Sequence, residues 1–171
     1  IVRAVEDSAG AIVVALDGSG QSWGALKTGI ELSRIFNRPL EAISAFDPQF
    51  HYVAFNSIAK VLSPAAASVF RFEEQERLHE EIIDSGLEKI YRGHLEVAKR
   101  LATEEEVSIR TTLLSGKAFE QVLRYAHETR PWLLVMGRIG VHSNSDLDLG
   151  SLTENLLRLA PCNLLLSARS F

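Results

Sequence analysis

Three glycines and a serine near the C-terminal end of the chain have the spacing of a phosphate-binding loop. Gly137 and Gly140 follow an apolar run, and nine residues later Gly150 and Ser151 open a stretch with helical periodicity. Glycine lets backbone N–H groups approach an anion closely, and a helix start adds unpaired N–H groups and a positive dipole end. A structural interpretation is also open, in which Gly137 only turns the chain and Ser151 forms a capping box with Glu154. The spacing alone does not decide between the two.

An aspartate, Asp17, ends the first apolar run of the chain, and Gly18 follows it directly. In an open parallel sheet, ligands bind outside the carboxyl ends of the strands where the strand order reverses. If the two apolar runs form neighbouring strands, Asp17 and Gly137 face each other across that crevice. A carboxylate there accepts hydrogen bonds from ribose hydroxyls or an adenine amino group while the glycine loop holds phosphates. The alternative is that Asp17 caps the helix starting near Gln21; the two elements together favour the ligand interpretation.

The elements that must position these residues alternate between strands and helices. Hydrophobic periodicity and the glycines and prolines between segments define them. Strands are predicted at 11–17, 40–46, 107–114, 132–136 and 163–167, and helices at about 21–37, 70–104, 117–129 and 151–159. This alternation predicts a doubly wound α/β sheet with right-handed crossovers and helices on both faces.

One domain of ordinary size accounts for most of the chain. Residues 1–10 are expected to be a tail or linker, and residues 11–171 a single domain with one core. An insertion is expected at about 47–70, where aromatic residues and alanines exceed what a crossover needs. These residues either offer a docking surface to a protein partner or fused domain, or cover the domain's own core.

Composition excludes several classes of function. A formal net charge of −4 without a Lys/Arg cluster argues against nucleic-acid binding. The single cysteine, Cys162, excludes an internal disulfide, fits a reducing, cytoplasmic location, and is predicted to be a core residue. No apolar stretch is long enough to span a bilayer. The chain begins at Ile1 rather than methionine, which is compatible with a piece of a longer protein or a removed targeting segment.

Three motifs in this order resemble the universal stress protein family, and more narrowly its ATP-binding branch. They are the run from Val14 to Ser19, the spacing Gly-x2-Gly-x9-Gly-Ser followed by Thr153-Glu154-Asn155, and Ala160-Pro161-Cys162. The resemblance covers most of residues 11–167 and is weaker in the middle. It implies a Rossmann-like, five-stranded parallel sheet with strand order 3-2-1-4-5. Strands 1 and 4 are then the switch point, which agrees with the position argued for Asp17.

The resemblance also implies nucleotide contacts at matching positions. Asp17 would hold the adenine or ribose end, with Ala15 and Leu16 lining the pocket, and Ala45 would offer backbone groups to the adenine ring. Met136 and Gly137 would contact the ribose and the α-phosphate. Donors to the phosphates would come from Gly140, Gly150, Ser151, Leu152 and Thr153. Each position could instead be structural, and Met136 and Leu152 in particular could be ordinary core.

The expected ligand is ATP with Mg²⁺, but the loop between Gly140 and Gly150 leaves alternatives open. Its nine residues contain Asp146 and Asp148 and no lysine or arginine. These carboxylates would repel a triphosphate unless they point outward or bind the divalent ion. Arg138 and His142 are the nearby candidate cations. The adenine and ribose half of the site is therefore better supported, and ADP, AMP or a cyclic nucleotide are alternatives to ATP.

Three functions fit this site. The preferred one is a nucleotide-dependent sensor or docking module of the stress response, whose ligand orders the loop 138–149 and changes a surface offered to a partner. A slow ATPase is the second, although the sequence shows no evident water-activating base, phosphate-binding lysine or arginine finger, and no catalytic residue is assigned. The third is an interaction module with a vestigial site. A homodimer is also expected, through the leucine-rich edge strand at 163–167.

Overall fold

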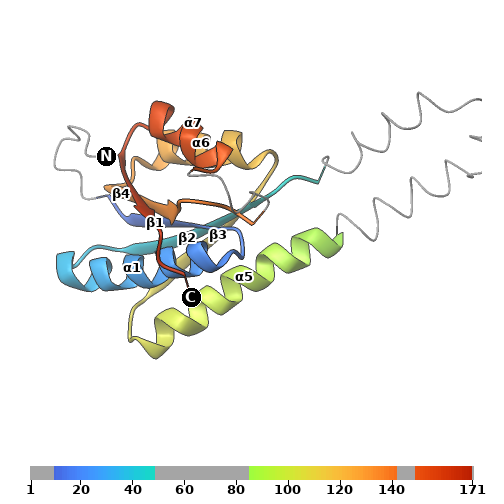
Figure 1. Cartoon of the computed structure of the whole chain (residues 1–171). Helices are drawn as coiled ribbons and strands as arrows, with labels where there is room; N and C mark the ends of the chain where they lie inside the picture. The colour runs from blue at the N-terminus through green and yellow to red at the C-terminus, as the bar shows by residue number, and fades with distance from the viewer. Residues whose placement is uncertain (1–9, 49–84, 142–148, 171) are drawn as a thin grey trace, which may run out of the picture.

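The computed structural model describes residues 10–48, 85–141 and 149–170. Its strands are β1 (Ile12–Leu16), β2 (Leu40–Phe46), β3 (Ile109–Ser115), β4 (Leu133–Gly137) and β5 (Asn163–Ser167). The helices among these residues are α1 (Gly20–Phe36), α5 (Ser85–Glu104), α6 (Ala118–Thr129) and α7 (Ser151–Leu159). The strands form one parallel sheet in the order β3-β2-β1-β4-β5 (Figure 1). The predicted fold class and strand order are confirmed.

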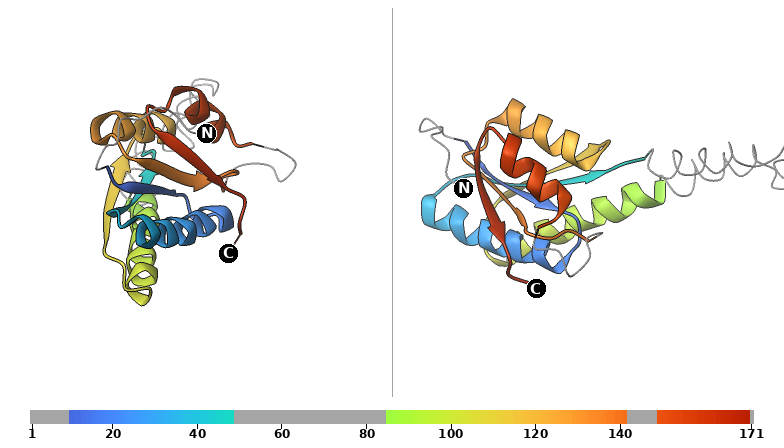
Figure 2. Two further views of the ribbon diagram at one scale, coloured as in Figure 1. Left: turned by 90° about the vertical axis from the view of Figure 1, so that its left-hand side faces the viewer. Right: turned by 45° about the horizontal axis from the view of Figure 1, so that its top comes forward.

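The sheet lies between two helical layers. Helices α1 and α5 cover one face, and α6 and α7 cover the other (Figures 1 and 2). Strand β1 is central, so its side chains are buried on both sides: Val14 packs toward α1 and α5, and Val13 toward α6 and α7. An uninterrupted apolar run is what such a strand requires. The first polar side chain, Asp17, therefore appears only where the strand leaves the core.

Pairing between β1 and β4 brings the first and fourth strands of the chain side by side. Ile12 pairs with Leu133 and Val14 with Val135, and β1 pairs with β2 on its other side. The strand order reverses at this β1–β4 pair. Because the strands are parallel, the residues after β1 and those after β4 emerge at the same edge of the sheet. The predicted meeting of Asp17 with the glycine loop follows from this register.

Several predicted boundaries differ from the structure by one or two residues, and two of these differences have a clear local cause. Helix α1 begins at Gly20 rather than near Gln21, because Ser19 is its N-cap and accepts a hydrogen bond from the Ser22 N–H. Strand β3 begins at Ile109 rather than at Val107. The N–H of Val107 instead donates to the Ala102 carbonyl at 2.9 Å, after Glu106 has turned to a φ of 57°. Val107 therefore caps the C-terminal end of α5, which itself ends at Glu104.

Several other expectations can be placed on this fold. Cys162 is 1% exposed and lies in the core beneath α6 and α7, as predicted. Within the described ranges, no helix combines the length and the apolar character needed to cross a bilayer. Beyond Pro48, the predicted insertion lies outside the described residues, and so does the first part of the predicted helix 70–104.

Candidate functional site

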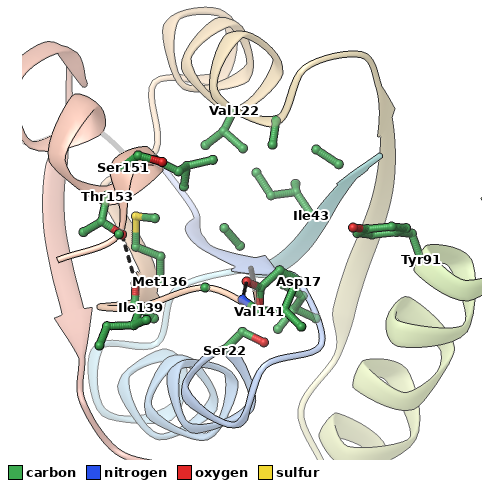
Figure 3. Close-up of a pocket in the computed structure, with 18 residues that line it drawn as sticks. Asp17, Ser22, Ile43, Tyr91, Val122, Met136, Ile139, Val141, Ser151 and Thr153 are labelled. Atoms are coloured by element: carbon green, nitrogen blue, oxygen red, sulfur yellow. Dashed lines mark hydrogen bonds between the residues drawn. The ribbon is translucent and has the colours of Figure 1, made fainter. Parts of the chain in front are cut away.

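A pocket of about 230 Å³ opens where β1, β2 and β4 end (Figure 3). All the positions predicted for the site line this one pocket: Ala15, Leu16, Asp17, Ala45, Met136, Gly137, Gly140, Gly150, Ser151, Leu152 and Thr153. They come from both ends of the chain and from β2 between them. Strand order thus gathers residues that are up to 138 positions apart, as the difference between the numbers of Thr153 and Ala15 shows.

Asp17 connects the first strand's loop with the glycine loop. Its Oδ1 accepts hydrogen bonds from the Ser19 N–H at 2.9 Å and from the Ser19 hydroxyl at 2.6 Å. Its Oδ2 accepts one from the Val141 N–H at 2.8 Å. The interpretation of Asp17 as a helix cap is wrong, because Ser19 caps α1. The carboxylate instead orients that serine and holds the first limb of the glycine loop.

Backbone hydrogen bonds fix both ends of the glycine loop. The Arg138 N–H donates to the Ser167 carbonyl at 3.0 Å, and the Arg138 carbonyl accepts from the Gly150 N–H at 3.1 Å. One residue further, the Ile139 N–H donates to Oε1 of Gln21 at 2.9 Å. The loop therefore leaves and re-enters the domain at one point, between β5 and the start of α1.

Gly137 and Gly140 are needed for close approach rather than for turning. Gly137 is the last residue of β4, and a Cβ there would lie 3.1 Å from Cβ of Gln21 and 3.2 Å from the Ser22 nitrogen. The interpretation of Gly137 as a simple turn residue is therefore wrong. A Cβ on Gly140 would lie 2.7 Å from Oδ2 of Asp17. A side chain at position 140 would therefore displace the Asp17 carboxylate oxygen that accepts from the Val141 N–H.

The start of α7 presents backbone donors to the pocket. Its N-cap is Gly150, which supplies no side-chain cap, and the first helical hydrogen bond runs from the Glu154 N–H to the Gly150 carbonyl at 2.9 Å. The N–H groups of Ser151, Leu152 and Thr153 precede that bond and have no acceptor within the helix. Such groups, together with the positive end of the helix dipole, form an anion-binding surface.

The predicted capping box does not form. Ser151 is the first residue of α7 rather than its cap, and its side chain is exposed. Glu154 does not reach back; its Oε1 pairs with Arg158 at 2.5 Å. Thr153 is buried, and its hydroxyl donates to the Gly137 carbonyl at 3.3 Å, which joins α7 to the end of β4. The structural alternative for this serine is therefore wrong.

Seven lining residues were not predicted: Ser22, Ile43, Tyr91, Ala118, Val122, Ile139 and Val141. Ile43 could have been found, because it lies on the same face of β2 as Ala45. Ala118 and Val122 are four positions apart on one face of α6. Tyr91 had no such signal, because α5 reaches the pocket only through the packing of the whole domain.

The described lining contains one carboxylate and no lysine or arginine. Arg138, a predicted candidate cation, is not among the lining residues, and His142, Asp146 and Asp148 lie outside the described residues. Burial of the Tyr91 phenol raises its pKa, and the negative charge of Asp17 raises it further. Across the described ranges, no three acidic, histidine or cysteine side chains gather closely enough to hold a metal ion.

Together these features define a class of protein: a Rossmann-like α/β domain whose pocket lies at the topological switch point and is lined by a glycine loop and a helix start. Residues 9–167 match the model of the universal stress protein family. The chain belongs to the universal stress protein family.

Similar proteins are found by sequence and by structure. A universal stress protein of Methanocaldococcus jannaschii is 28% identical over 165 residues, which cover 96% of this chain and 85% of that protein. The structure of the universal stress protein UspA from Lactobacillus plantarum has a TM-score of 0.70 at 17% identity, covering 95% of this chain and 99% of that one. A universal stress protein solved in complex with cAMP has a TM-score of 0.62 at 22% identity, covering 95% and 100% of the two chains.

Proposed function

We propose that this chain is an adenine-nucleotide-binding regulatory domain of the stress response, with its ligand in the pocket between β1 and β4. The observation that carries the proposal is that every predicted contact residue lines this one pocket at the switch point. The complex of a structurally similar universal stress protein with cAMP supports an adenine nucleotide as the ligand class.

The distribution of charge in the pocket favours one orientation of the nucleotide. The Asp17 carboxylate would repel a phosphate, whereas ribose hydroxyls and an adenine amino group are donors that it can accept. Ser151, the first residue of α7, lies across the pocket from Asp17 (Figure 3). We therefore place the ribose and base beside Asp17, Ala15 and Ala45, and the phosphates at Gly150 to Thr153.

The donors around the pocket bear on how many phosphates the ligand carries. Backbone N–H groups and a helix dipole supply partial charges, which suit one or two phosphates. ATP fits if Mg²⁺ accompanies it, because this ion is usually held by substrate phosphates, water and one or two carboxylates. Asp146 and Asp148 are the carboxylates that the sequence offers for that ion. AMP, ADP or a cyclic nucleotide is the alternative, favoured by the lack of lysine and arginine in the described lining.

Asp17 also provides a way for the ligand to change the surface. Its Oδ2 holds the N–H of Val141, whose side chain is 52% exposed at the pocket mouth. A ribose hydroxyl that donates to this oxygen competes with that bond and shifts the first limb of the loop. We propose this exchange as the signal to a protein partner.

The alternative of slow ATP hydrolysis is tested by measuring phosphate release when the protein is incubated with Mg-ATP.

A second copy of the chain is the proposed cover for β5. This strand is at the edge of the sheet and pairs with β4 on one side (Figure 2). Leu165 and Leu166 are only partly buried in it. An unpaired, leucine-rich edge favours pairing with the same edge of another subunit.

The proposed binding is tested by calorimetric titration with Mg-ATP, AMP and cAMP. Wild-type protein is expected to bind at least one of them saturably, and Gly140→Val to abolish binding because its side chain meets Asp17. Gly93→Val is the matched control, since a Cβ at this exposed position of α5 has nothing within 4 Å. Equal binding by wild type and Gly140→Val, or no binding by wild type, would contradict the proposal.

A further inference from the structure

Helix α5 contributes one side chain to the pocket, and that side chain is aromatic. Tyr91 lines the pocket, and its phenol points from α5 into it with the hydroxyl foremost (Figure 3). Ser151 and Thr153 lie on the opposite side of the pocket, and Ile43 lies between them and Tyr91 (Figure 3). The Tyr91 side of the pocket is therefore an apolar space bounded by an aromatic ring.

The Tyr91 ring packs against two aromatic neighbours. Its centroid lies 6.3 Å from that of Phe46 at the end of β2 and 5.5 Å from that of His94 one turn further along α5. His94 in turn packs edge-on against Trp23 of α1, with centroids 5.8 Å apart. It also fills the space beside Gly18, where a Cβ would come within 2.6 Å of the imidazole. The ring is thus positioned before any ligand arrives.

The Tyr91 hydroxyl is available as a donor. It has no hydrogen-bond partner among the described residues. Burial and the nearby Asp17 both raise its pKa, so it carries its proton at neutral pH. A donor in an apolar space, beside a fixed aromatic ring, matches a planar ligand that has hydrogen-bond acceptors at its edge.

We infer that Tyr91 recognises the base of the bound nucleotide and gives the site its preference for purines. The base lies on the Tyr91 side of the pocket, beside Ile43, packs against the phenol ring, and accepts a hydrogen bond from the hydroxyl through a ring nitrogen. A pyrimidine has a smaller face and leaves part of this space unfilled. This inference rests on the proposed nucleotide site and names the residue that selects its base.

The test compares Tyr91→Leu and Tyr91→Phe with wild type in the intact chain, using AMP, CMP and ribose 5-phosphate as probes. Loss of base stacking in Tyr91→Leu is expected to weaken AMP binding about tenfold. Loss of the hydroxyl alone in Tyr91→Phe is expected to weaken it about threefold. Binding of ribose 5-phosphate, which has no base, should change less than twofold, and the ratio of AMP to CMP affinity should fall in Tyr91→Leu. Ile90→Ala, an exposed neighbour on α5, is the control.

A second measurement is independent of variant folding. Nuclear Overhauser effects between the Tyr91 ring protons and the base protons of AMP are expected in the saturated wild-type complex. Their absence at saturation, or AMP binding by folded Tyr91→Leu within twofold of wild type, overturns the inference and leaves the proposed function standing. Failure of wild type to bind any adenine nucleotide overturns both.

Discussion

Asp17 shows how one side chain serves both local structure and the site. Its two oxygens accept three hydrogen bonds, from the N–H and hydroxyl of Ser19 and from the N–H of Val141. Through Ser19 it supports the start of α1, and through Val141 it holds the glycine loop. A Cβ on Gly140 would lie 2.7 Å from Oδ2, so a side chain at this position would collide with the carboxylate. The aspartate and this glycine therefore depend on each other.

Gly137 gives a prediction for stability. In Gly137→Ala the added methyl group would meet Gln21 and the Ser22 backbone at 3.1–3.2 Å, so β4 and α1 must separate slightly. We expect a loss of about 1–3 kcal/mol in the free energy of unfolding, measured by urea denaturation. The matched control is Gly93→Ala, which adds a methyl group to open space on a helix and should stabilise by about 0.5–1 kcal/mol. Equal stabilities for the two variants would contradict this account of Gly137.

His94 gives a prediction for pH dependence. Burial lowers its pKa, the charge of Asp17 partly opposes this effect, and its Nδ1 is buried without a partner among the described residues. The folded state therefore binds a proton less readily than the unfolded state. The stabilisation present above the unfolded pKa of about 6.5 is lost as the pH falls toward the folded value.

The measurement is the free energy of unfolding of wild type and His94→Phe between about pH 7.5 and about pH 5. Wild type should lose more stability on acidification than the variant, because phenylalanine keeps the contacts with Trp23 and Tyr91 but has no proton to bind. Parallel pH profiles for the two proteins would show that His94 does not contribute.

Among the elements, α6 is attached to the sheet by a polar cluster around the buried carboxylate of Glu41. Glu41 of β2 is 8% exposed, and its carboxylate accepts a hydrogen bond from the Tyr125 hydroxyl of α6 at 2.5 Å. Arg110 of the edge strand β3 pairs with the other carboxylate oxygen at 2.5 Å. This cluster fixes the helix that carries Ala118 and Val122, which form one wall of the pocket.

Tyr125→Phe tests that attachment. The variant keeps the ring but leaves a buried carboxylate without one donor, which should cost about 1.5–3 kcal/mol in the free energy of unfolding. Arg110→Met should cost less, at most about 1 kcal/mol, because the Arg110 side chain is 65% exposed. Urea denaturation with an unchanged m value measures both losses. A larger loss for Arg110→Met than for Tyr125→Phe would contradict the proposed attachment.

Features that follow from neighbouring residues or from the strand order could be predicted from the sequence, whereas features that depend on helix ends or on tertiary packing could not. The central strands were found because burial on both faces demands an apolar run, and the pocket residues because the parallel strand order brings Asp17 and Gly137 together. The start of β3 was misplaced because Val107 is needed to finish α5. The capping box failed because Gly150, not Ser151, precedes the helix. Tyr91 was missed because its position depends on how α5 packs across the sheet.

At the scale of the whole molecule, the site and the proposed subunit contact use different edges of the sheet. The pocket occupies the carboxyl ends of β1, β2 and β4, whereas β5 forms one lateral edge (Figures 1 and 2). Ligand binding and subunit pairing therefore need not compete. The Arg138 N–H, bonded to the Ser167 carbonyl, joins the glycine loop to that edge strand.

The homodimer is a prediction for solution. Sedimentation analysis at micromolar concentration should show a dimer, and Leu166→Arg should shift it toward monomer by placing a charge on the edge strand. Leu159→Arg, at an exposed leucine at the end of α7, is the control and should leave the dimer intact. A strictly monomeric wild-type protein would contradict the proposed pairing.

The insertion predicted at about 47–70 is interpreted either as a docking surface for a protein partner or as a cover for the domain's own core. Limited proteolysis of the isolated chain separates these two interpretations. Cleavage within residues 49–69 is expected for a docking segment, and protection of those residues favours the cover.

The most direct test of the account is a nuclear magnetic resonance titration of the backbone amides with Mg-ATP and with AMP. We predict saturable shifts at Gly140, Val141, Ser151 and Leu152, which surround the pocket. The amide of Trp132, whose indole contacts Arg38 at the amino ends of the strands, should not move. No shift at millimolar nucleotide, or shifts centred on the amino ends of the strands, would contradict the central claim that the switch-point pocket binds an adenine nucleotide.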